Sequence, residues 1–210
     1  MSRPNLGDSK FVSRGLRHLK GADPVMASII RQVGAFKLKP SRERFGMLVR
    51  SILSQQISVA AARTIRNRLL NQMPNRRFTA TAVLEFSIDD LRAIGISRQK
   101  AGYLLSLAEH STNGSLNFRR IGQLHDEDVI AELIQVKGIG RWTAQMFLIF
   151  GLGRPDIFAP DDLGLRAAIR NQYDFHDMPS NTQASEVAAV WSPYASIASW
   201  YCWRSLEMPK

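Results

Sequence analysis

The stretch Val136–Ala144, which reads Val-Lys-Gly-Ile-Gly-Arg-Trp-Thr-Ala, is the most informative part of this chain. Its Gly138-Ile139-Gly140 core predicts a tight hairpin that leads into a helix. The first turn of a helix leaves backbone N–H groups without intrahelical partners, so such a hairpin can hold a phosphate. Pro160-Asp161-Asp162 follows and predicts a carboxylate pair at the start of another helix. The two stretches together favour a protein that grips a nucleic-acid backbone and sets a carboxylate against it.

The hairpin sequence resembles the helix-hairpin-helix of the base-excision DNA glycosylases. The matching residues are Leu133, Val136, Lys137, Gly138, Ile139, Gly140, Thr143 and Ala144. Asp162 is similar to the catalytic aspartate of that superfamily. The resemblance implies an enzyme that cleaves the bond between a damaged base and its sugar.

A second motif resembles the signature of the DNA-3-methyladenine glycosylase II (AlkA-like) branch of that superfamily. It runs Phe45-x-x-Leu48-Val49-x-x-Ile52-Leu53-Ser54-Gln55-Gln56-Ile57-Ser58-x-x-Ala61-Ala62. Two independent motifs in the right order are specific, whereas Gly-x-Gly alone is a weak signal. The likeness extends from about Arg17 to Trp203, which is nearly the whole chain.

Length and composition indicate a soluble globular protein. A chain of 210 residues can form one domain or two small lobes around a shared cleft. Its hydrophobic content is 45% and its charged content 22%, and no apolar run reaches the roughly 18 residues of a membrane span. The first 20 residues lack the apolar core of a signal peptide. We therefore expect a monomer in the bacterial cytoplasm, associated with the nucleoid through DNA binding.

Cysteine and histidine usage gives no sign of a metal cofactor. The single cysteine, Cys202, excludes an internal disulfide and the four-cysteine iron–sulfur cluster of some superfamily members. It lies among aromatic residues and is predicted to be a small core residue. The histidines show no zinc spacing; they are His18, His110, His125 and His176. No metal held by side chains, and no other cofactor, is predicted.

The charge is strongly basic and uneven. The net charge is +10 and the isoelectric point is about 10.3. Residues 1–50 hold 11 Lys and Arg against 3 Asp and Glu, a surplus of 8 that leaves +2 for the rest of the chain. Such a balance fits a polyanionic partner that is bound through counterion release. The alternative is a solvated basic surface without a partner.

The apolar pattern predicts an all-α protein of roughly ten helices, because no segment sustains a period of two. The first dozen residues, with Pro4 and Gly7, are expected to be loosely ordered. Capping residues are predicted at Ser87 and Ser97, and a stop at Gly95. Helices are predicted over about 25–33, 45–53, 58–73, 88–94 and 97–108, from Asp126 toward the hairpin, and from Leu163.

The resemblance implies two helical lobes around a cleft. Residues 41–155 would form a six-helix lobe that ends in the helix-hairpin-helix, at about 128–150. Residues 1–40 would pack with the C-terminal lobe, residues 156–210, which begins with the loop of the catalytic aspartate. The active cleft would lie between the lobes, with Asp162 at the junction.

The resemblance assigns catalysis to Asp162. A carboxylate beside the sugar can stabilise an oxocarbenium-like transition state, orient a water molecule, or both. Asp161 matches a less constant position beside the base pocket, and is expected to cap or stabilise the helix that starts at Leu163. Without the resemblance, plain helix capping is the more common role for either aspartate.

The candidates for the base pocket are Asp161, Trp142, Met146 and Tyr194. Glycosylases that also cut the strand carry a lysine where this chain has Trp142, and this difference implies a monofunctional enzyme. An indole can also stack on a cationic alkylated purine. Met146 lies one turn later on the same face, and Tyr194 matches a pocket aromatic of the family. Core packing is the alternative for Trp142.

The segment around Gln55 and Gln56 is the candidate wedge. The family inserts it into the minor groove to fill the space of the flipped nucleotide, and Ser58 begins the next helix. Solvated capping groups at a helix end are the alternative for the two glutamines. The predicted DNA-binding residues are Gln55, Gln56, Ser58, Lys137, Gly138, Ile139, Gly140 and Thr143. Relatives also bind a monovalent cation through hairpin carbonyls, here those of Val136 and Gly138.

The expected function is therefore monofunctional removal of alkylated purines from duplex DNA in base excision repair. The resemblance implies 3-methyladenine and 7-methylguanine as substrates and an abasic site as product. One alternative is a non-catalytic helix-hairpin-helix module, which leaves Asp162, Trp142 and the wedge unexplained together. Another is a glycosylase for mismatched or oxidised bases, although such relatives usually carry the cluster cysteines or the hairpin lysine. Ethenoadenine and hypoxanthine are candidate side substrates.

Overall fold

The computed structural model describes residues 4–208, and all regular secondary structure in that range is helical. The chain separates into two compact units. The first comprises the described residues up to Pro40 and those from Leu148 onward, and the second comprises Ser41–Phe147. The expected boundary at residue 155 therefore differs from the observed one, because residues 148–155 belong to the first unit.

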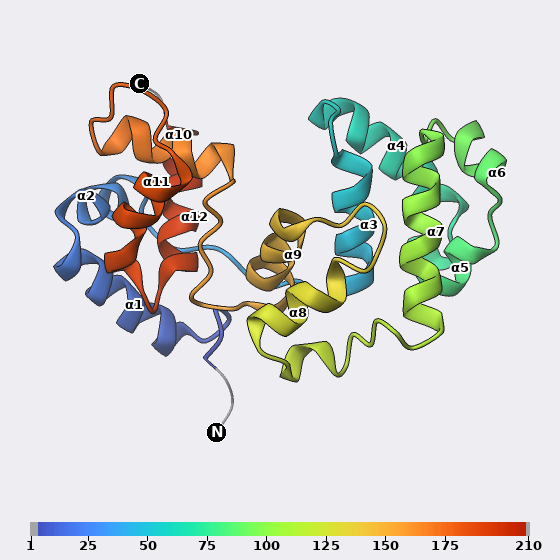
Figure 1. Cartoon of the computed structure of the whole chain (residues 1–210), viewed down its shortest axis with the longest axis horizontal. Helices are drawn as coiled ribbons and strands as arrows, with labels where there is room; N and C mark the ends of the chain where they lie inside the picture. Colours follow the sequence, from blue (N-terminus) through green and yellow to red (C-terminus); the bar gives the residue numbers. More distant parts are fainter. Residues whose placement is uncertain (1–3, 209–210) are drawn as a thin grey trace. The chain divides into compact units, whose positions relative to one another are not determined.

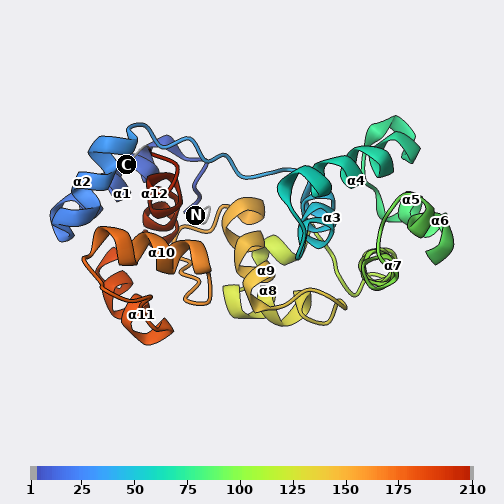
Figure 2. The same cartoon turned by 90° about the horizontal axis from the view of Figure 1, so that it is seen from above.

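The first unit is built around its last helix (Figures 1 and 2). Its helices are α1 (Ser9–Ala22), α2 (Pro24–Val33), α10 (Leu163–Gln172), α11 (Asn181–Ala188) and α12 (Ala195–Ser205), with a π-helical stretch at Leu148–Leu152 and a 3₁₀ turn at Ala189–Trp191. Helix α12 packs against α1, α2 and α10, and it lies between the α1–α2 pair and the α10–α11 pair in Figure 2. Nine of its eleven residues are buried, which explains why its sequence shows no amphipathic period.

A buried carboxylate ties this unit together. Asp23 is the N-cap of α2, where its Oδ1 accepts from the backbone N–H groups of Val25 and Met26. Its Oδ2 accepts hydrogen bonds from the Trp191 Nε1 at 2.9 Å and from the Tyr173 hydroxyl. Burial raises the pKa of the Tyr173 hydroxyl far above its usual value. The chain ends therefore fold together through a saturated polar cluster as well as through apolar contact.

The N-terminal region is more ordered than expected. Residues 1–3 of the predicted loose segment lie outside the described residues, but α1 already begins at Ser9, with Asp8 as its N-cap. The Leu6 side chain is buried and its N–H donates to Gly153 O at 2.9 Å, while Asn5 Nδ2 donates to Leu152 O at 2.7 Å. Tertiary hydrogen bonds order this segment, and a local sequence pattern does not reveal them.

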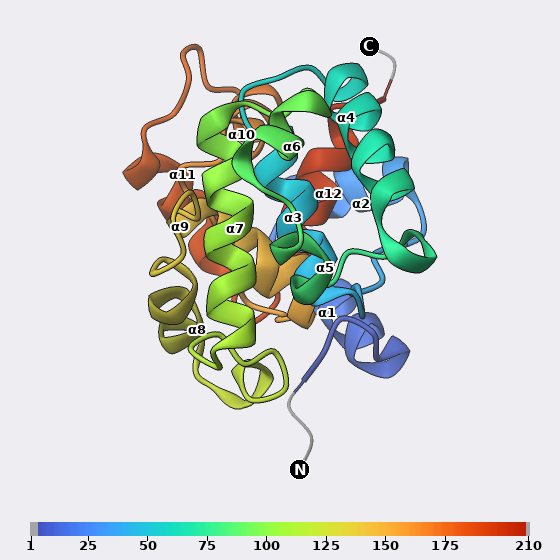
Figure 3. The same cartoon turned by 90° about the vertical axis from the view of Figure 1, so that its right-hand side faces the viewer.

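The second unit packs around α7 and α3 (Figure 3). Its helices are α3 (Arg44–Ser54), α4 (Val59–Gln72), α5 (Ala80–Leu84), α6 (Ile88–Ala93), α7 (Arg98–Thr112), α8 (Asp126–Leu133) and α9 (Arg141–Phe147), with 3₁₀ turns at Pro74–Arg76 and Ile121–Gln123. Helix α7 packs on α3, α5 and α6, and α3 also contacts α4 and α9. The predicted caps are confirmed at Ser97 and at Ser87, which forms a capping box with Asp90.

The predicted six-helix lobe is corrected to seven α-helices in this unit. The helix that the pattern did not predict is α5, which has only five residues. A helix of little more than one turn is too short to show an apolar period, and it is stabilised mainly by tertiary packing. For the same reason the described residues hold twelve α-helices where roughly ten were expected.

Candidate functional site

The hairpin of the second unit connects α8 to α9. Val136 N–H donates to Leu133 O and Ile139 N–H donates to Val136 O, both at 3.1 Å, and these bonds close the loop on itself. The side chains of Val136 and Ile139 are buried and fix the loop to the core. The exposed Lys137 lies between them. The hairpin is therefore a rigid element rather than a flexible connection.

Gly138 is required by the fold itself. Its φ is +84°, in the region that favours glycine. A Cβ at this position would lie 2.1 Å from Cδ2 of the Tyr103 ring, which comes from α7. The Tyr103 hydroxyl accepts a hydrogen bond from Gln99 Nε2 at 2.6 Å, so the ring has an anchored position. From the sequence we expected this glycine also to allow a phosphate to approach closely, and no local pattern indicates the contact with Tyr103.

Gly140 is different. It has no left-handed φ, and a Cβ built on it meets nothing within 4 Å. Its carbonyl accepts from Ala144 N–H at 3.0 Å, and this bond places it at the start of α9. Nothing within the described residues therefore requires a glycine here, in contrast to Gly138.

The wedge segment is attached to the hairpin. Gln55 Nε2 donates to Gly138 O at 2.8 Å, so the Gln55 side chain links the end of α3 to the loop. Lys100 Nζ donates to Leu53 O at 2.8 Å and to Gln55 O at 2.6 Å. Burial lowers the pKa of the Lys100 amine below its ordinary value. Sequence reasoning missed Lys100, since a lone lysine in an amphipathic helix gives no sign of its partners.

The two glutamines differ in exposure. Gln56 is exposed and has a φ of +54°, whereas Gln55 is half-buried. Ile57, next in the chain, is also exposed. Ser58 caps α4 by accepting from Ala61 N–H at 3.2 Å, so its hydroxyl has a structural role. Of the two predicted wedge residues, Gln56 is the one whose side chain faces solvent.

The first turns of α9 separate exposed from buried candidates. Trp142 is 41% exposed, which argues against plain core packing as its only role. Met146 is buried, and Thr143 as a whole residue is only 4% exposed, which leaves little of it accessible to DNA. Arg141 forms an ion pair with Glu127 of α8, with N···O distances of 2.5 and 3.0 Å. This pair ties the two helices of the motif together.

The carbonyls predicted to bind a monovalent cation already accept hydrogen bonds. Val136 O accepts from Ile139 N–H and Gly138 O accepts from Gln55 Nε2. A carbonyl oxygen has a second lone pair, so each is chemically able to take one more partner. Within residues 4–208 no group of three or more His, Cys, Asp or Glu side chains is arranged to hold a metal ion.

Asp162 lies in the first unit, at the start of α10. It is the N-cap of that helix, and its Oδ1 accepts from Leu165 N–H at 2.7 Å and from Trp203 Nε1 at 3.0 Å. The side chain is only 7% exposed. Two donors from different helices therefore fix the orientation of one buried carboxylate, which also caps α10.

Trp203 is a further residue that sequence reasoning missed as part of the site. Its ring centroid lies 5.5 Å from that of Phe150. Gly164 lets it approach α10, because a Cβ there would meet Trp203 Cδ1 at 3.2 Å and Asp162 Oδ1 at 3.1 Å. The clustering of Trp200, Tyr201 and Trp203 around Cys202 pointed only to a core, and Cys202 is indeed fully buried.

The predicted capping role of Asp161 needs correction. The cap of α10 is Asp162, not Asp161, which is exposed and accepts a hydrogen bond from Asn181 Nδ2. An N-cap must directly precede the first helical residue, and the helix begins at Leu163. This hydrogen bond connects the Asp161 carboxylate to the start of α11.

Tyr194, whose pocket role stays a prediction, packs against α1. Its ring lies 5.1 Å from the Phe11 ring and 5.2 Å from the His18 ring, measured between centroids. Gly15 admits the ring, because a Cβ there would meet Tyr194 Cδ1 at 2.7 Å. The pairing of a C-terminal aromatic with glycine in α1 is a tertiary feature that local sequence does not encode.

Comparison with known proteins places these features in a family. Residues 49–193 match the model of the HhH-GPD superfamily of base excision DNA repair proteins. DNA-3-methyladenine glycosylase 1 of Schizosaccharomyces pombe is 31% identical over 196 residues, which cover 91% of this chain and 86% of the relative. A solved structure of the S. pombe 3-methyladenine DNA glycosylase, in complex with abasic DNA, has a TM-score of 0.85 at 30% identity and covers 93% of this chain and 97% of that one.

The chain belongs to the HhH-GPD superfamily of base excision DNA repair proteins. Within it, the resemblance to the glycosylase II branch is confirmed by DNA-3-methyladenine glycosylase 2 of Escherichia coli, 28% identical over 170 residues. That match covers 77% of this chain and 57% of the relative. No helix in residues 4–208 has both the length and the apolar character to cross a membrane.

Proposed function

We propose that the protein is a monofunctional DNA glycosylase of base excision repair that removes 3-methyladenine, and also 7-methylguanine, from duplex DNA and leaves an abasic site. The observation that carries the proposal is Asp162, a buried carboxylate held by Leu165 N–H and Trp203 Nε1 in a chain of this superfamily. A carboxylate fixed in one orientation can act on a reacting sugar with little reorganisation.

The chemistry asked of Asp162 is electrostatic. Breaking the C–N bond between base and sugar develops positive charge on the sugar, and a fixed carboxylate stabilises that charge and orients the attacking water. A base that already carries a positive charge is a good leaving group, so a strong general acid is not needed. Trp203 Nε1–H keeps the carboxylate in one orientation and is a positioning residue.

Trp142 is assigned to the damaged base. Its exposed indole can stack on an electron-poor alkylated purine once that base has left the helix. An indole cannot form a Schiff base with the sugar, and the protein is therefore proposed to lack strand-cutting activity. Replacing Trp142 by Ala is expected to lower kcat/KM for base release about 10- to 100-fold, the loss of one stacked base, while Phe retains most of it. Initial rates of base release check this expectation.

The hairpin is assigned to the DNA backbone. Gly140 leaves open space where a phosphate can approach the backbone closely, and Lys137 supplies an exposed positive charge. Gly138, Ile139 and Thr143 contribute through the shape of the loop, since the side chains of Ile139 and Thr143 are buried. Gln56 is assigned to the wedge, and Gln55 positions it by its bond to Gly138 O. A monovalent cation at the carbonyls of Val136 and Gly138 is part of the proposal.

The proposal extends to the setting of the reaction. Duplex DNA with damaged bases is the partner, and the net charge of +10 favours binding to it. A monomeric state, and action on the nucleoid in the bacterial cytoplasm, are predictions that sedimentation and imaging can check.

The decisive experiment incubates the protein with methylated duplex DNA and quantifies free 3-methyladenine and 7-methylguanine by chromatography. Wild type is expected to release both, and Asp162→Asn to release neither at a comparable rate. The same DNA is examined for strand breaks, which are expected only after hot alkali. Breaks without alkali would contradict the monofunctional assignment. Salt-sensitive DNA binding without base release from methylated DNA would favour a non-catalytic binding module or a glycosylase for another lesion.

A further inference from the structure

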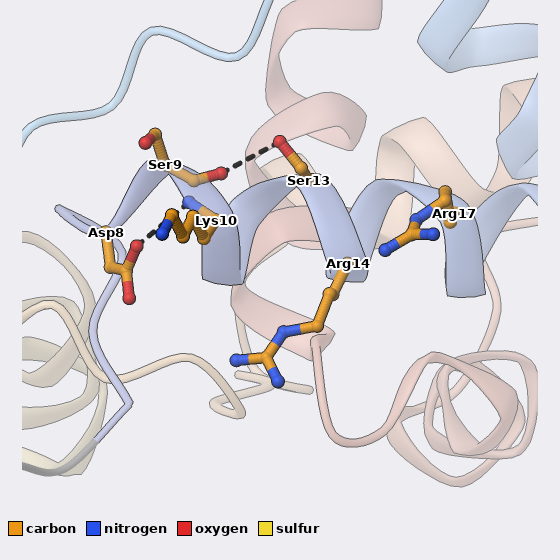
Figure 4. A pocket seen from close by; sticks show the side chains of 6 residues that line it. All are labelled: Asp8, Ser9, Lys10, Ser13, Arg14 and Arg17. Atoms are coloured by element: carbon orange, nitrogen blue, oxygen red, sulfur yellow. Dashed lines mark hydrogen bonds between the residues drawn. The ribbon is translucent and has the colours of Figure 1, made fainter.

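Helix α1 presents three cations on one face, Lys10, Arg14 and Arg17, here called the α1 basic face (Figure 4). All three side chains are exposed, and they lie at helical spacings of four and three residues. They border a hollow of about 540 Å³ on the surface of the first unit. The hollow is lined by Asp8, Ser9, Lys10, Ser13, Arg14 and Arg17.

The charge of this face is not balanced within the protein. Among residues 4–208 no ion pair involves Lys10, Arg14 or Arg17, although other arginines, such as Arg120 and Arg204, do pair with carboxylates. The one acid of the hollow, Asp8, caps α1 by accepting from the backbone N–H groups of Lys10 and Phe11. Like charges three and four residues apart destabilise a helix, so a counter-charge from outside the chain would stabilise α1.

The side chains on this face are suited to a strand of phosphates. The Arg14 guanidinium carbon lies 5.7 Å from the centroid of the Phe11 ring, which restrains that side chain. Ser9 and Ser13 are short side chains beside the cations, and the Ser13 hydroxyl donates to Ser9 O at 2.8 Å (Figure 4). A phosphate oxygen can therefore approach α1 alongside the long cationic side chains.

The spacing of the charges matches a nucleic-acid strand. Lys10 and Arg17 are seven residues apart, which is about 10 Å along a helix axis. A strand of B-DNA carries one phosphate per roughly 3.4 Å of axis, hence about three phosphates over that length. Three cations thus meet about three phosphates. A patch for a short acidic peptide would not need this regular array.

We propose that the α1 basic face binds the phosphate backbone of DNA, and that it is a contact of the first unit in addition to the hairpin of the second. The proposal rests on the function proposed above, because it assumes DNA as the partner. It accounts for part of the surplus of 8 positive charges in residues 1–50. The contact is independent of base sequence and contributes affinity rather than lesion recognition.

The test compares two triple variants with the same loss of charge. Lys10→Gln, Arg14→Gln and Arg17→Gln remove the face, and glutamine retains helix propensity and stem length. The control replaces Arg31, Lys37 and Lys39 by Gln; all three are exposed cations of the first unit outside the hollow. Binding of a fluorescent undamaged duplex is measured over a series of KCl concentrations. Base release from methylated DNA at saturating protein is measured on the same preparations.

The α1 triple variant is expected to reduce the slope of log Kobs against log salt by about 2 to 3, and to weaken binding about 10- to 100-fold near 0.1 M salt. The control is expected to change the slope by less than about 1. Arg14→Lys with Arg17→Lys, which keeps the charge, is expected to retain the wild-type slope. The rate of base release at saturation is expected to stay within about twofold of wild type, because a backbone contact acts on binding.

Several results would overturn the proposal. An unchanged slope in the α1 variant would mean a solvated face or an acidic protein partner, and equal slopes in the two triples would mean that only net charge matters. Failure of the proposed function gives a different result from failure of this proposal. In that case wild type would release no base, but the α1 variant would still lose salt-sensitive binding. Thermal unfolding of each variant shows whether a loss of binding reflects loss of fold, and the lysine variant keeps the comparison valid if the glutamine variant is unstable.

Discussion

The hairpin between α8 and α9 and the start of α10 differ in whether the fold and the proposed function depend on the same residue. In the hairpin they depend on different residues: Gly138 has a left-handed φ and the Tyr103 ring against it, whereas Gly140 has open space and an ordinary φ. At the start of α10 they depend on one carboxylate, since Asp162 both caps the helix and is the proposed catalytic group.

This contrast between the hairpin and Asp162 determines which substitutions can change binding or catalysis without changing stability. In the hairpin, a methyl group added at Gly138 tests stability, and a methyl group added at Gly140 tests DNA binding. At Asp162 only an isosteric substitution separates catalysis from stability. Asparagine retains an oxygen that accepts from Leu165 N–H and Trp203 Nε1, but it loses the negative charge. Three predictions follow from this contrast, beginning with the largest effect.

Replacing Asp162 by Asn is expected to lower the rate of base release on the order of 10²- to 10⁴-fold, because the transition-state charge on the sugar loses its stabilising partner. The free energy of unfolding should change by less than about 1 kcal/mol, since Asn is a good N-cap. DNA affinity should be equal or higher, because a negative charge is removed. Single-turnover kinetics and urea unfolding measure the two quantities.

Asp162→Ala is the matched control. It should be as inactive as Asn and less stable by about 2–4 kcal/mol, because the cap is lost and the half-buried Trp203 Nε1 loses its acceptor. Full activity of the asparagine variant would remove Asp162 from catalysis and leave it a cap only.

Replacing Gly138 by Ala is expected to lower the free energy of unfolding by about 2–4 kcal/mol. The methyl group would have to displace the Tyr103 ring, and the left-handed φ adds strain for any residue with a Cβ. Urea or thermal unfolding measures the loss. Gly138→Ala combined with Tyr103→Ala should recover part of it, and no recovery would mean that the backbone strain, rather than the ring, dominates.

Replacing Gly140 by Ala is expected to have the smallest effect on stability, less than about 1 kcal/mol, since the methyl group meets no atom of the protein. DNA affinity at fixed salt should fall roughly tenfold, because the methyl group would stand where a phosphate is proposed to approach. Fluorescence anisotropy with undamaged duplex measures the affinity. Unchanged affinity would show that the phosphate does not approach Gly140.

Much of the fold was predictable because its signals are local. The apolar spacing of residues 45–53, the capping box at Ser87 and the acidic first turn of α8 each use neighbours along the chain, and each predicted helix exists. Among the helices that local patterns missed, α1 is ordered by tertiary hydrogen bonds at its start, and others are short or largely buried. Helix α5 has five residues, and most of α12 is buried on all sides.

The candidate site was predictable only in part, for a similar reason. Local motifs identified the hairpin glycines, the exposed Trp142 and Asp162, and the family comparison covers all of them. The residues that hold these groups come from distant parts of the chain, namely Tyr103, Lys100 and Trp203. Tyr194 was assigned to a pocket because its contact with Phe11 is equally distant in sequence.

The sequence by itself determined the all-α class, the superfamily, the hairpin and its connection to a carboxylate, because each depends on residue types at short and fixed spacings. Only the packed structure shows that Gly138 accommodates the Tyr103 ring, that Trp203 holds the Asp162 carboxylate, and that Gln55 is held by Gly138 while Gln56 is exposed. Those facts depend on which distant side chains meet. Such meetings follow from the packing of whole helices, which no local pattern encodes.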